Sequence, residues 1–306
     1  MKSASVTVVS WFAGLTACIV VLAYLSPQDF AHTFSSLGFS GIFAWITLTL
    51  AARIFLAETT VAPLAALGFE SSRWDMFWIN WLRSFANQII PLSGIAALAG
   101  SLRTRMPISW SELAALGSPL FVLSAIALGG VGLVATGLNV ATLGHAAVVL
   151  AAVYLGVICA GLGAAFGAAR ALDSLPRAVS VRIAKLSDSL RTLARTPGLL
   201  LRVTACHAAA ILLRGSRLWI VFAAADTVFG VRETLLVIAI AESSMLIQLT
   251  PGGLGVREGA VLGGAALLGV PVPVAASVAL VDRIFMVALT ALMVAPAVTL
   301  LRRPTA

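Results

Sequence analysis

The chain is built from long apolar segments separated by short polar ones. A helix needs about 20 apolar residues to cross a hydrocarbon core about 30 Å thick. Segments that approach or exceed this length are expected as helices at Val6 to Leu25, Gly41 to Ala57, Leu116 to Thr136, Leu143 to Ala165, Gly198 to Ala225 and Ala276 to Leu301. With the shorter apolar arms between them, the pattern predicts an all-α polytopic membrane protein with about six to eight transmembrane helices. We expect one integral membrane domain over residues 1–306.

The first apolar segment has two interpretations. One is a cleaved signal peptide, but the apolar run is long for such a peptide and no small-x-small cleavage site precedes Ser26-Pro27. An uncleaved first span is therefore preferred. The loop from Ser26 to Ser40 contains no Lys or Arg and is expected outside. The mixed polar stretch from Thr59 to Asp75 is expected as a cytoplasmic connection.

A polar interruption divides the segment from Met76 to Gly100. A continuous span there would place the basic stretch from Arg170 to Arg195 outside, against the rule that basic loops stay in the cytoplasm. A re-entrant hairpin that breaks around Pro91, within Asn87 to Gly94, returns the chain to the side from which it came. Every basic loop is then cytoplasmic, including the connection over 166–197, and both termini are expected on that side.

A second interruption is centred on Pro251. The stretch from Thr250 to Gly259 is rich in glycine and follows an apolar arm that carries Glu242 and Gln248. Topology does not decide between a second hairpin and two full spans here, because both return the chain to the same side. The two interruptions share a Gln-x-x-Pro pattern, starting at Gln88 and at Gln248, which favours an internal repeat of paired broken helices.

Composition supports the membrane assignment and excludes several other classes. Hydrophobic residues make up 60% of the 306 residues, charged residues make up 10%, and the mean hydropathy of +1.04 lies outside the range of soluble domains. The formal charge of +8 comes mostly from Arg in short loops beside apolar runs, so nucleic acid is not expected as a partner. Three isolated cysteines support neither a disulfide framework nor a zinc site, and we expect no metal and no cofactor.

Charged residues inside the apolar segments need partners. An uncompensated Arg near the bilayer centre costs about 2.5 to 3.5 kcal/mol. Arg214 and Arg217 lie deep in the segment from Gly198, so we expect an anionic ligand or acidic partners there. The candidate partners are Glu242 and Asp282, the second of which is followed by Arg283.

One face of the arm before the first interruption is polar, since Asn80, Arg83 and Asn87 follow helical spacing. Such a stripe faces a water-filled cavity or forms a hydrogen-bonded seam with another helix, and the sequence leaves both interpretations open. Arg53 lies near the end of its own segment. It is expected to extend its guanidinium to the membrane surface rather than to act in the interior.

The second interruption has the chemistry of an anion site. Its glycines, Gly252, Gly253 and Gly255, permit backbone angles that other residues avoid, and a helix is expected to start near the last of them. The free N–H groups of that helix carry a partial positive charge, to which Arg257 adds a bidentate donor. Glu258 is expected to bind a positive headgroup or to restrain an Arg. Glycines that only let helices pack closely give the same pattern, and that alternative stays open.

These residues resemble a known family. Pro251 to Glu258, preceded by Glu242 and Gln248, is similar to the signature of the lysylphosphatidylglycerol synthase transmembrane, or flippase-like, family. Asn87 to Gly94 resembles that family's first break, although Ser93 and the Ala-rich stretch after it depart from the pattern. The resemblance implies an integral protein of the bacterial inner membrane that moves or presents lipids. Such lipids include aminoacylated phospholipids and polyprenyl- or hopanoid-linked intermediates.

Bifunctional members of that family carry a soluble aminoacyl-transferase domain after the membrane part. The chain ends at Ala306, so we expect no synthase activity. The sequence also contains no nucleophile with a base and no phosphate-binding loop of the kinase type, so it is not expected to be an enzyme. Membrane lipids are the expected partners, and a separate lipid-modifying enzyme is a further candidate.

The resulting hypothesis is a polar cavity, lined by both interruptions, that binds a lipid phosphate while the acyl chains stay in the bilayer. The residues expected to line it are Arg83, Asn87, Gln88, Arg214, Arg217, Glu242, Gln248, Gly252, Gly253, Gly255, Arg257, Glu258, Asp282 and Arg283. One alternative is a secondary transporter of a small organic anion, coupled to protons through Glu242, Glu258 or Asp282. Another is a non-transporting subunit that holds a separate transferase.

Overall fold

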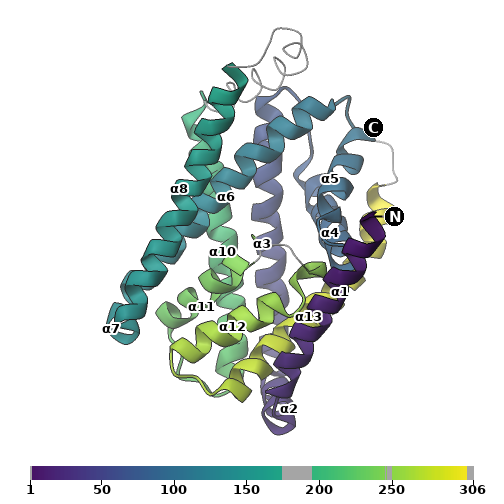
Figure 1. The fold of residues 1–306 in the computed structure, drawn as a ribbon. Coiled ribbons are helices and arrows are strands. Elements are labelled where there is room, and N and C mark those ends of the chain that lie inside the picture. Colours follow the sequence, from purple (N-terminus) through teal and green to yellow (C-terminus); the bar gives the residue numbers. More distant parts are fainter. Residues whose placement is uncertain (1, 174–194, 245, 247–249, 302–306) are drawn as a thin grey trace.

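The computed structural model describes residues 2–173, 195–244, 246 and 250–301, and every regular element in these residues is helical (Figure 1). The predicted all-α class is therefore confirmed. The elements are α1 (Lys2–Ala23), α2 (Pro27–Ser36), α3 (Gly38–Ala66), α4 (Arg73–Ile89), α5 (Ser93–Arg103), α6 (Trp110–Leu138), α7 (Val140–Leu143), α8 (His145–Asp173), α10 (Pro197–Ala224), α11 (Val231–Ser244), the 3-10 turn η1 (Pro251–Gly253), α12 (Val256–Leu267) and α13 (Val272–Leu301).

Five of the described helices are long and apolar enough to cross a membrane, as expected for a multi-pass membrane protein. They are α3, α6, α8, α10 and α13. The pair α1 and α2, bent by 91°, counts as a sixth span if it is taken as one. The predicted connection over 166–197 is shorter than expected, because α8 extends into it. Residues 174–194, on which the rest of that prediction falls, lie outside the described residues.

The predicted outer loop from Ser26 to Ser40 is largely helical. Ser26 caps α2, because its side chain accepts a hydrogen bond from the N–H of Asp29. Pro27 begins the helix, where its fixed φ suits the first turn and its missing N–H is not needed. The sequence-based expectation overlooked this Ser-Pro start, so a short helix takes the place of the loop.

The predicted connection from Thr59 to Asp75 is also shorter than expected, since α3 continues to Ala66 and only residues 67–72 are non-helical. Glu58 marked the end of the predicted span. In the structure its carboxylate lies 2.9 Å from Nε of Arg73 and 2.5 Å from Nη2 of Arg202. Because these two arginines neutralise the Glu58 carboxylate, α3 can continue past this residue.

The predicted break around Pro91 is confirmed. Residues 90–92 separate α4 from α5, Leu92 has the left-handed φ of 63°, and Asn87 accepts a hydrogen bond from the N–H of Gly94 at 2.6 Å. With 17 and 11 residues, the two helices are about 26 and 17 Å long, short of the 30 Å needed to cross a hydrocarbon core. They pack against each other, so the pair forms a re-entrant hairpin.

The segment around Pro251 forms a second hairpin, which decides the alternative that the sequence left open. Its arms, α11 and α12, pack against each other and have 14 and 12 residues, or about 21 and 18 Å. Gly252, Gly253 and Gly255 between them have φ of 57°, 71° and 76°. Residues with a side chain rarely adopt these angles, so the glycines are required by the turn itself.

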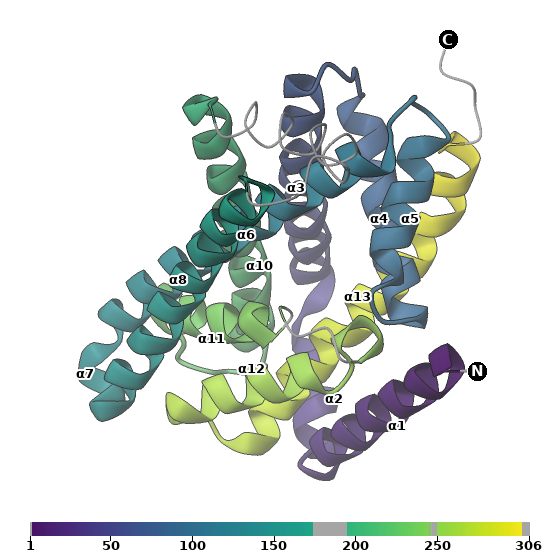
Figure 2. The ribbon, with the colours of Figure 1, turned by 45° about the horizontal axis from the view of Figure 1, so that its top comes forward.

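The two hairpins enter from opposite ends of the molecule (Figure 2). Helix α3 leads to the end where α4 begins and α5 finishes, whereas α10 leads to the other end, where α11 begins and α12 finishes. A long helix follows each hairpin, α6 in the first half and α13 in the second. Helix α6 packs against α11 and α13 packs against α4, so each half supports the hairpin of the other. This inverted order supports the predicted internal repeat.

Helices α6 and α8 approach each other closely through glycine. A Cβ built on Gly132 would lie 2.3 Å from ring carbons of Tyr154, and one built on Gly129 would lie 2.4 Å from Cγ1 of Ile158. Neither position has room for a side chain. Close approach of this kind favours helix association in lipid, where no hydrophobic driving force acts between helices.

Candidate functional site

Charged side chains gather between the hairpins and the long helices α3, α10 and α13, in two groups that differ in exposure and pairing. The sealed cluster comprises Arg217, Arg257, Glu258, Asp282 and Arg283, and both of its carboxylates are no more than 2% exposed. The open cluster comprises Arg53, Arg83, His207, Arg214 and Glu242.

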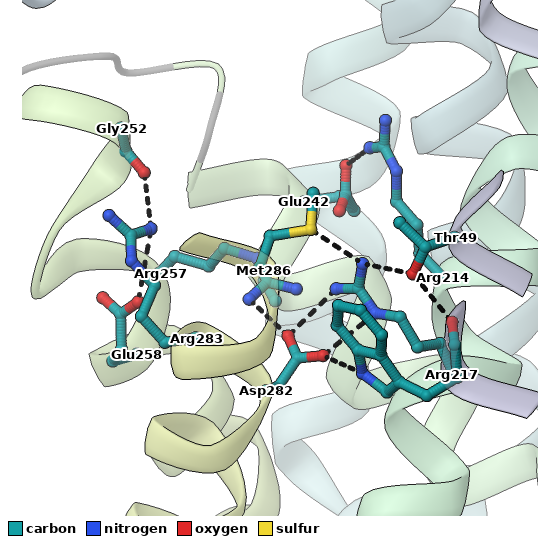
Figure 3. A network of polar contacts seen from close by, with 12 residues as sticks. Thr49, Arg214, Arg217, Glu242, Gly252, Arg257, Glu258, Asp282, Arg283 and Met286 are labelled. Carbon is teal, nitrogen blue, oxygen red and sulfur yellow. Dashed lines mark hydrogen bonds and ion pairs between the residues drawn. The ribbon is translucent and has the colours of Figure 1, made fainter. Parts of the chain in front are cut away.

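Asp282 is the centre of the sealed cluster (Figure 3). Its Oδ2 accepts hydrogen bonds from Nη2 of Arg217 at 2.9 Å and from Nη1 of Arg257 at 2.8 Å. Its Oδ1 accepts one from Nε1 of Trp45 at 3.0 Å, and Nε of Arg217 lies 2.9 Å from the same oxygen. The carboxylate therefore ties together α3, α10, α12 and α13. These charge-assisted bonds offset the cost of holding the three charges away from water.

The N-terminus of α12 is closed by a side chain of its own first turn. Oε2 of Glu258 accepts a hydrogen bond from the N–H of Gly255 at 2.7 Å, where an anion was predicted to bind. Nη1 of Arg283 donates to the carbonyl of Gly252 at 2.8 Å and lies 3.5 Å from Oε1 of Glu258. Arg257 is turned toward Asp282 instead (Figure 3). In this structure the residues of the predicted clamp thus bind other groups of the chain.

The open cluster has an excess of positive charge. Arg214 pairs with Glu242, and their side chains are 25% and 12% exposed. Arg83 lies within electrostatic range of Arg214 and makes no ion pair or hydrogen bond with any described residue. His207 lies near the same two arginines, and its Nε2 has no hydrogen-bond partner in the described part of the chain. With Arg53, three guanidiniums share one carboxylate, which leaves the cluster suited to an anion.

Arg53 is 8% exposed and lies in the interior, so its predicted extension to the membrane surface is wrong. Its Nη1 donates to Oγ of Ser84 at 2.5 Å and to the carbonyl of Asn80 at 3.4 Å. Its guanidinium lies 4.5 Å from the centre of the Trp81 ring. The polar face of α4 therefore forms the hydrogen-bonded seam, with Arg53 of α3. It also contributes Arg83 to the open cluster.

The two breaks meet in the middle of the molecule. A Cβ built on Gly252 would lie 3.1 Å from Cγ of Gln88 and 3.1 Å from Nη2 of Arg283, so the turn of the second hairpin touches the end of α4. Both breaks therefore belong to one junction, as the hypothesis of a shared site requires. Asn87 has a structural role there, since it holds the first turn. Gln248, the remaining member of the predicted set, lies outside the described residues.

Helix α1 lies across this junction. Nε1 of Trp11 donates to the carbonyl of Ile89, at the end of α4, at 3.1 Å. Gly14 lies against the second break, because a Cβ built on it would be 3.2 Å from Cβ of Thr250. One helix therefore contacts both breaks, a feature that the sequence did not predict.

The expected partners of the two deep arginines are confirmed, since Arg214 pairs with Glu242 and Arg217 with Asp282. Sequence reasoning did not assign Arg53 or Trp45 to the site. The polar face of α4, which offers hydrogen-bond acceptors, could have indicated an interior position for Arg53. No comparable signal existed for Trp45, which lies in an apolar helix. Among the described residues, no group of three or more His, Cys, Asp or Glu is placed to hold a metal ion.

Comparison with known proteins gives one result. The sequence profile of the family described as Lysylphosphatidylglycerol synthase TM region matches residues 5–293, which include both hairpins and both clusters. Among curated proteins and among solved structures, none matches this chain.

Proposed function

Because the chain belongs to the lysylphosphatidylglycerol synthase transmembrane-region family, a membrane domain linked to lipid metabolism, we propose that it binds a phosphate-bearing lipid and translocates or presents it. The candidate lipids are a phospholipid, an aminoacyl-phospholipid and a polyprenyl- or hopanoid-linked intermediate. No covalent step is needed for this role, so the chain acts as a carrier and not as an enzyme. A separate lipid-modifying enzyme is the proposed partner that makes or uses the lipid.

The observation that carries the proposal is Arg83 in the open cluster, which has no partner among the described residues. In the described part of the chain, three arginines and one carboxylate leave an excess of two positive charges in a largely buried region. Holding such charges without counterions is costly. A phosphate offers acceptor oxygens to several guanidiniums at once, and each such bond is charge-assisted. A phosphate bound between Arg83 and Arg214 would therefore complete the cluster.

A lipid fits this position better than a free anion because the cluster lies between helices that face the bilayer. The acyl chains remain in hydrocarbon while the headgroup enters the polar interior, so no charge crosses the apolar core unaccompanied. The sealed cluster fixes the hairpins on which the open cluster depends. We assign binding to Arg83 and Arg214 and support of the junction to Asp282 and its partners.

The proposed setting is the bacterial inner membrane, with both chain termini in the cytoplasm. One end of the molecule carries the described residues Arg73, Arg103, Arg105 and Arg202, at the ends of α3 to α5 and the start of α10 (Figure 1). The opposite end carries Asp29, Asp226 and Glu233 with Arg232. The basic end is the cytoplasmic one under the positive-inside rule.

The test is lipid movement in proteoliposomes that contain phosphatidylglycerol with a fluorescent acyl chain. Dithionite added outside bleaches the outer leaflet, and further loss of fluorescence reports transfer from the inner one. Arg83→Gln should slow this transfer by about tenfold, equivalent to one lost charge-assisted contact of about 1.4 kcal/mol. Arg232→Gln is the matched control, because Arg232 is exposed and pairs with Glu233, its neighbour in sequence.

Three outcomes are informative. Slower transfer in Arg83→Gln with an unchanged control supports the proposal. Equal rates in both variants and in the unmodified protein would remove the open cluster from the path of the lipid. Uptake of a soluble organic phosphate such as glycerol 3-phosphate, without lipid movement, would favour a transporter of small anions.

A further inference from the structure

Helix α1 covers the sealed cluster from outside. Gly255, at the start of α12, lies directly beneath it, since a Cβ built there would be 2.3 Å from Cβ of Ala17 and 2.8 Å from the backbone N of Cys18. Cys18 is close enough to Glu258 and Arg283 to interact with their charges. Together with the contact of Trp11 at the first break, this places one helix between the junction and its surroundings.

Polar atoms without partners lie beneath this helix. The hydroxyl of Thr250 belongs to a residue that is 3% exposed and has no hydrogen-bond partner among the described residues. Nε of Arg283 is likewise buried and without one. A buried donor that bonds to nothing costs about 1 to 3 kcal/mol, so such atoms mark a place where a polar group is missing. Both atoms flank the turn of the second hairpin, where Arg283 also bonds to the carbonyl of Gly252.

Helix α1 is held much less firmly than the helix that follows it. Its described side chains, those from Trp11 onward, make one hydrogen bond to the rest of the protein, that of Trp11, and no ion pair. Its other face is apolar and exposed, at Phe12, Leu15 and Ile19 among others. In a bilayer, lipid tails replace apolar helix contacts at little cost. The contacts of α1 can therefore be exchanged for lipid.

Helix α2, by contrast, is anchored. The ring of Phe34 stacks on that of Phe285 in α13, with centroids 5.7 Å apart and an interplanar angle of 2°. Nε2 of His32 lies 3.4 Å from the carboxylate of Asp226, which follows α10. The bend of 91° between α1 and α2 thus separates a weakly held arm from a fixed base. This is the arrangement of a hinge.

We infer that α1 is a lateral gate over the sealed cluster, closed in this structure, and that the Thr250 hydroxyl and Arg283, at the edge of that cluster, form a second station for the lipid headgroup. The inference rests on the proposed function. A headgroup bound at the open cluster passes to the Thr250 hydroxyl and Arg283 when α1 swings away about its bend. The lipid then returns to the bilayer beside α1. The open cluster and this second station thereby lie at the two ends of one path, as the inverted hairpins suggest.

A reversible disulfide tests the gate. Gly14→Cys with Thr250→Cys joins α1 to the second break, since the built Cβ of Gly14 lies 3.2 Å from that of Thr250, close to the about 3.8 Å of natural disulfides. Cys18, Cys159 and Cys206 are replaced by Ser beforehand. The reduced double variant is the reference, because Thr250→Cys also removes a hydroxyl of the second station. In the proteoliposome assay with fluorescent phosphatidylglycerol, oxidation should slow transfer by at least about tenfold relative to this reference, and reductant should return transfer to the reference rate.

The chain offers a matched control pair. Ala125→Cys with Gly161→Cys joins α6 to α8, and the built Cβ of Gly161 lies 3.4 Å from that of Ala125. Its oxidation should change transfer by less than about twofold, because these helices are not required to separate. An oxidised Gly14–Thr250 pair that transfers lipid as fast as its reduced form would overturn the gate and leave the proposed function standing.

A second measurement does not depend on lipid transfer. Trp11→Phe removes the hydrogen bond to Ile89 and should open the gate more often. In a protein that keeps Cys18 and has Ser at the other two cysteines, a membrane-permeant maleimide should then label Cys18 about threefold faster, an effect of about 0.7 kcal/mol. Unchanged labelling would overturn the gate. A protein that labels faster but moves no lipid would keep the gate and overturn the proposed function.

Discussion

Arg214 and Arg217 lie one turn apart on α10, yet their surroundings differ in two ways. Arg217 is 2% exposed and shares Asp282 with Arg257. Arg214 is 25% exposed, and Glu242, its one partner among the described residues, lies near further cations. A matched and enclosed guanidinium stabilises the fold, whereas one that is in excess and reachable can bind an anion. Charge balance and exposure, and not residue type, separate the arginines that build the junction from those that we propose to bind lipid.

The largest effect is expected in the sealed cluster. Asp282→Asn leaves Arg217 and Arg257 without a counterion in a closed interior and should lower the free energy of unfolding by about 3 to 5 kcal/mol. Glu242→Gln makes the same change of carboxylate to amide in the open cluster, where the partner Arg214 is 25% exposed and other cations lie nearby, and should cost about 1 kcal/mol or less. Thermal unfolding in detergent compares the two. Equal losses would erase the distinction between the clusters.

A smaller effect, on binding and not on stability, is expected for Arg83. Arg83→Gln removes a charge that has no partner among the described residues, so the unfolding midpoint should stay the same or rise. The affinity for phosphatidylglycerol should fall by about tenfold, as expected for a charge-assisted bond. Native mass spectrometry of the protein in detergent, titrated with this lipid, measures the ratio of bound to free protein. A lowered unfolding midpoint with unchanged affinity would place Arg83 with the structural arginines.

The smallest effect is expected from Glu242→Gln on the same titration. Its carboxylate competes with a phosphate for Arg214, so removing the negative charge should raise lipid affinity, by about threefold for a partly exposed pair. The expected change in lipid affinity is opposite in direction to that of Arg83→Gln, so the two variants together test whether the open cluster binds the lipid phosphate. A loss of affinity would instead show that Glu242 itself holds the headgroup, through a positive group.

The long helices, both breaks and two ion pairs were predictable because a bilayer imposes strict conditions. Apolar length fixes a span, and basic loops fix its direction, which is why a hairpin at Pro91 was preferred to a full span. Deep arginines require partners, which identified Glu242 and Asp282 as candidates, although the sequence did not show which arginine each of them binds. Each of these conditions depends only on the order of the segments and on residue type, and the sequence alone supplies this information.

The contacts that could not be predicted depend on which helix faces pack against each other between distant parts of the chain. Arg257 was expected at the break but lies against Asp282, because the first turn of α12 points it toward α13 and not into the turn. Arg53 was expected at the surface but meets Ser84, because α4 turns its polar face toward α3. The position of α1 over both breaks follows from the bend before Pro27, and periodicity within one helix does not contain that information.

One consequence of the junction concerns how far this sequence can diverge. Gly252 has a φ of 57° and touches Gln88 and Arg283, so a side chain there would strain the backbone and would also require these neighbours to shift. Nothing lies within 4 Å of a Cβ built on Gly259 or Gly263, further along the same arm. In relatives that keep this architecture, substitutions should therefore be common at the later glycines and rare at position 252, where a single methyl group would strain the turn at the contact between the two hairpins.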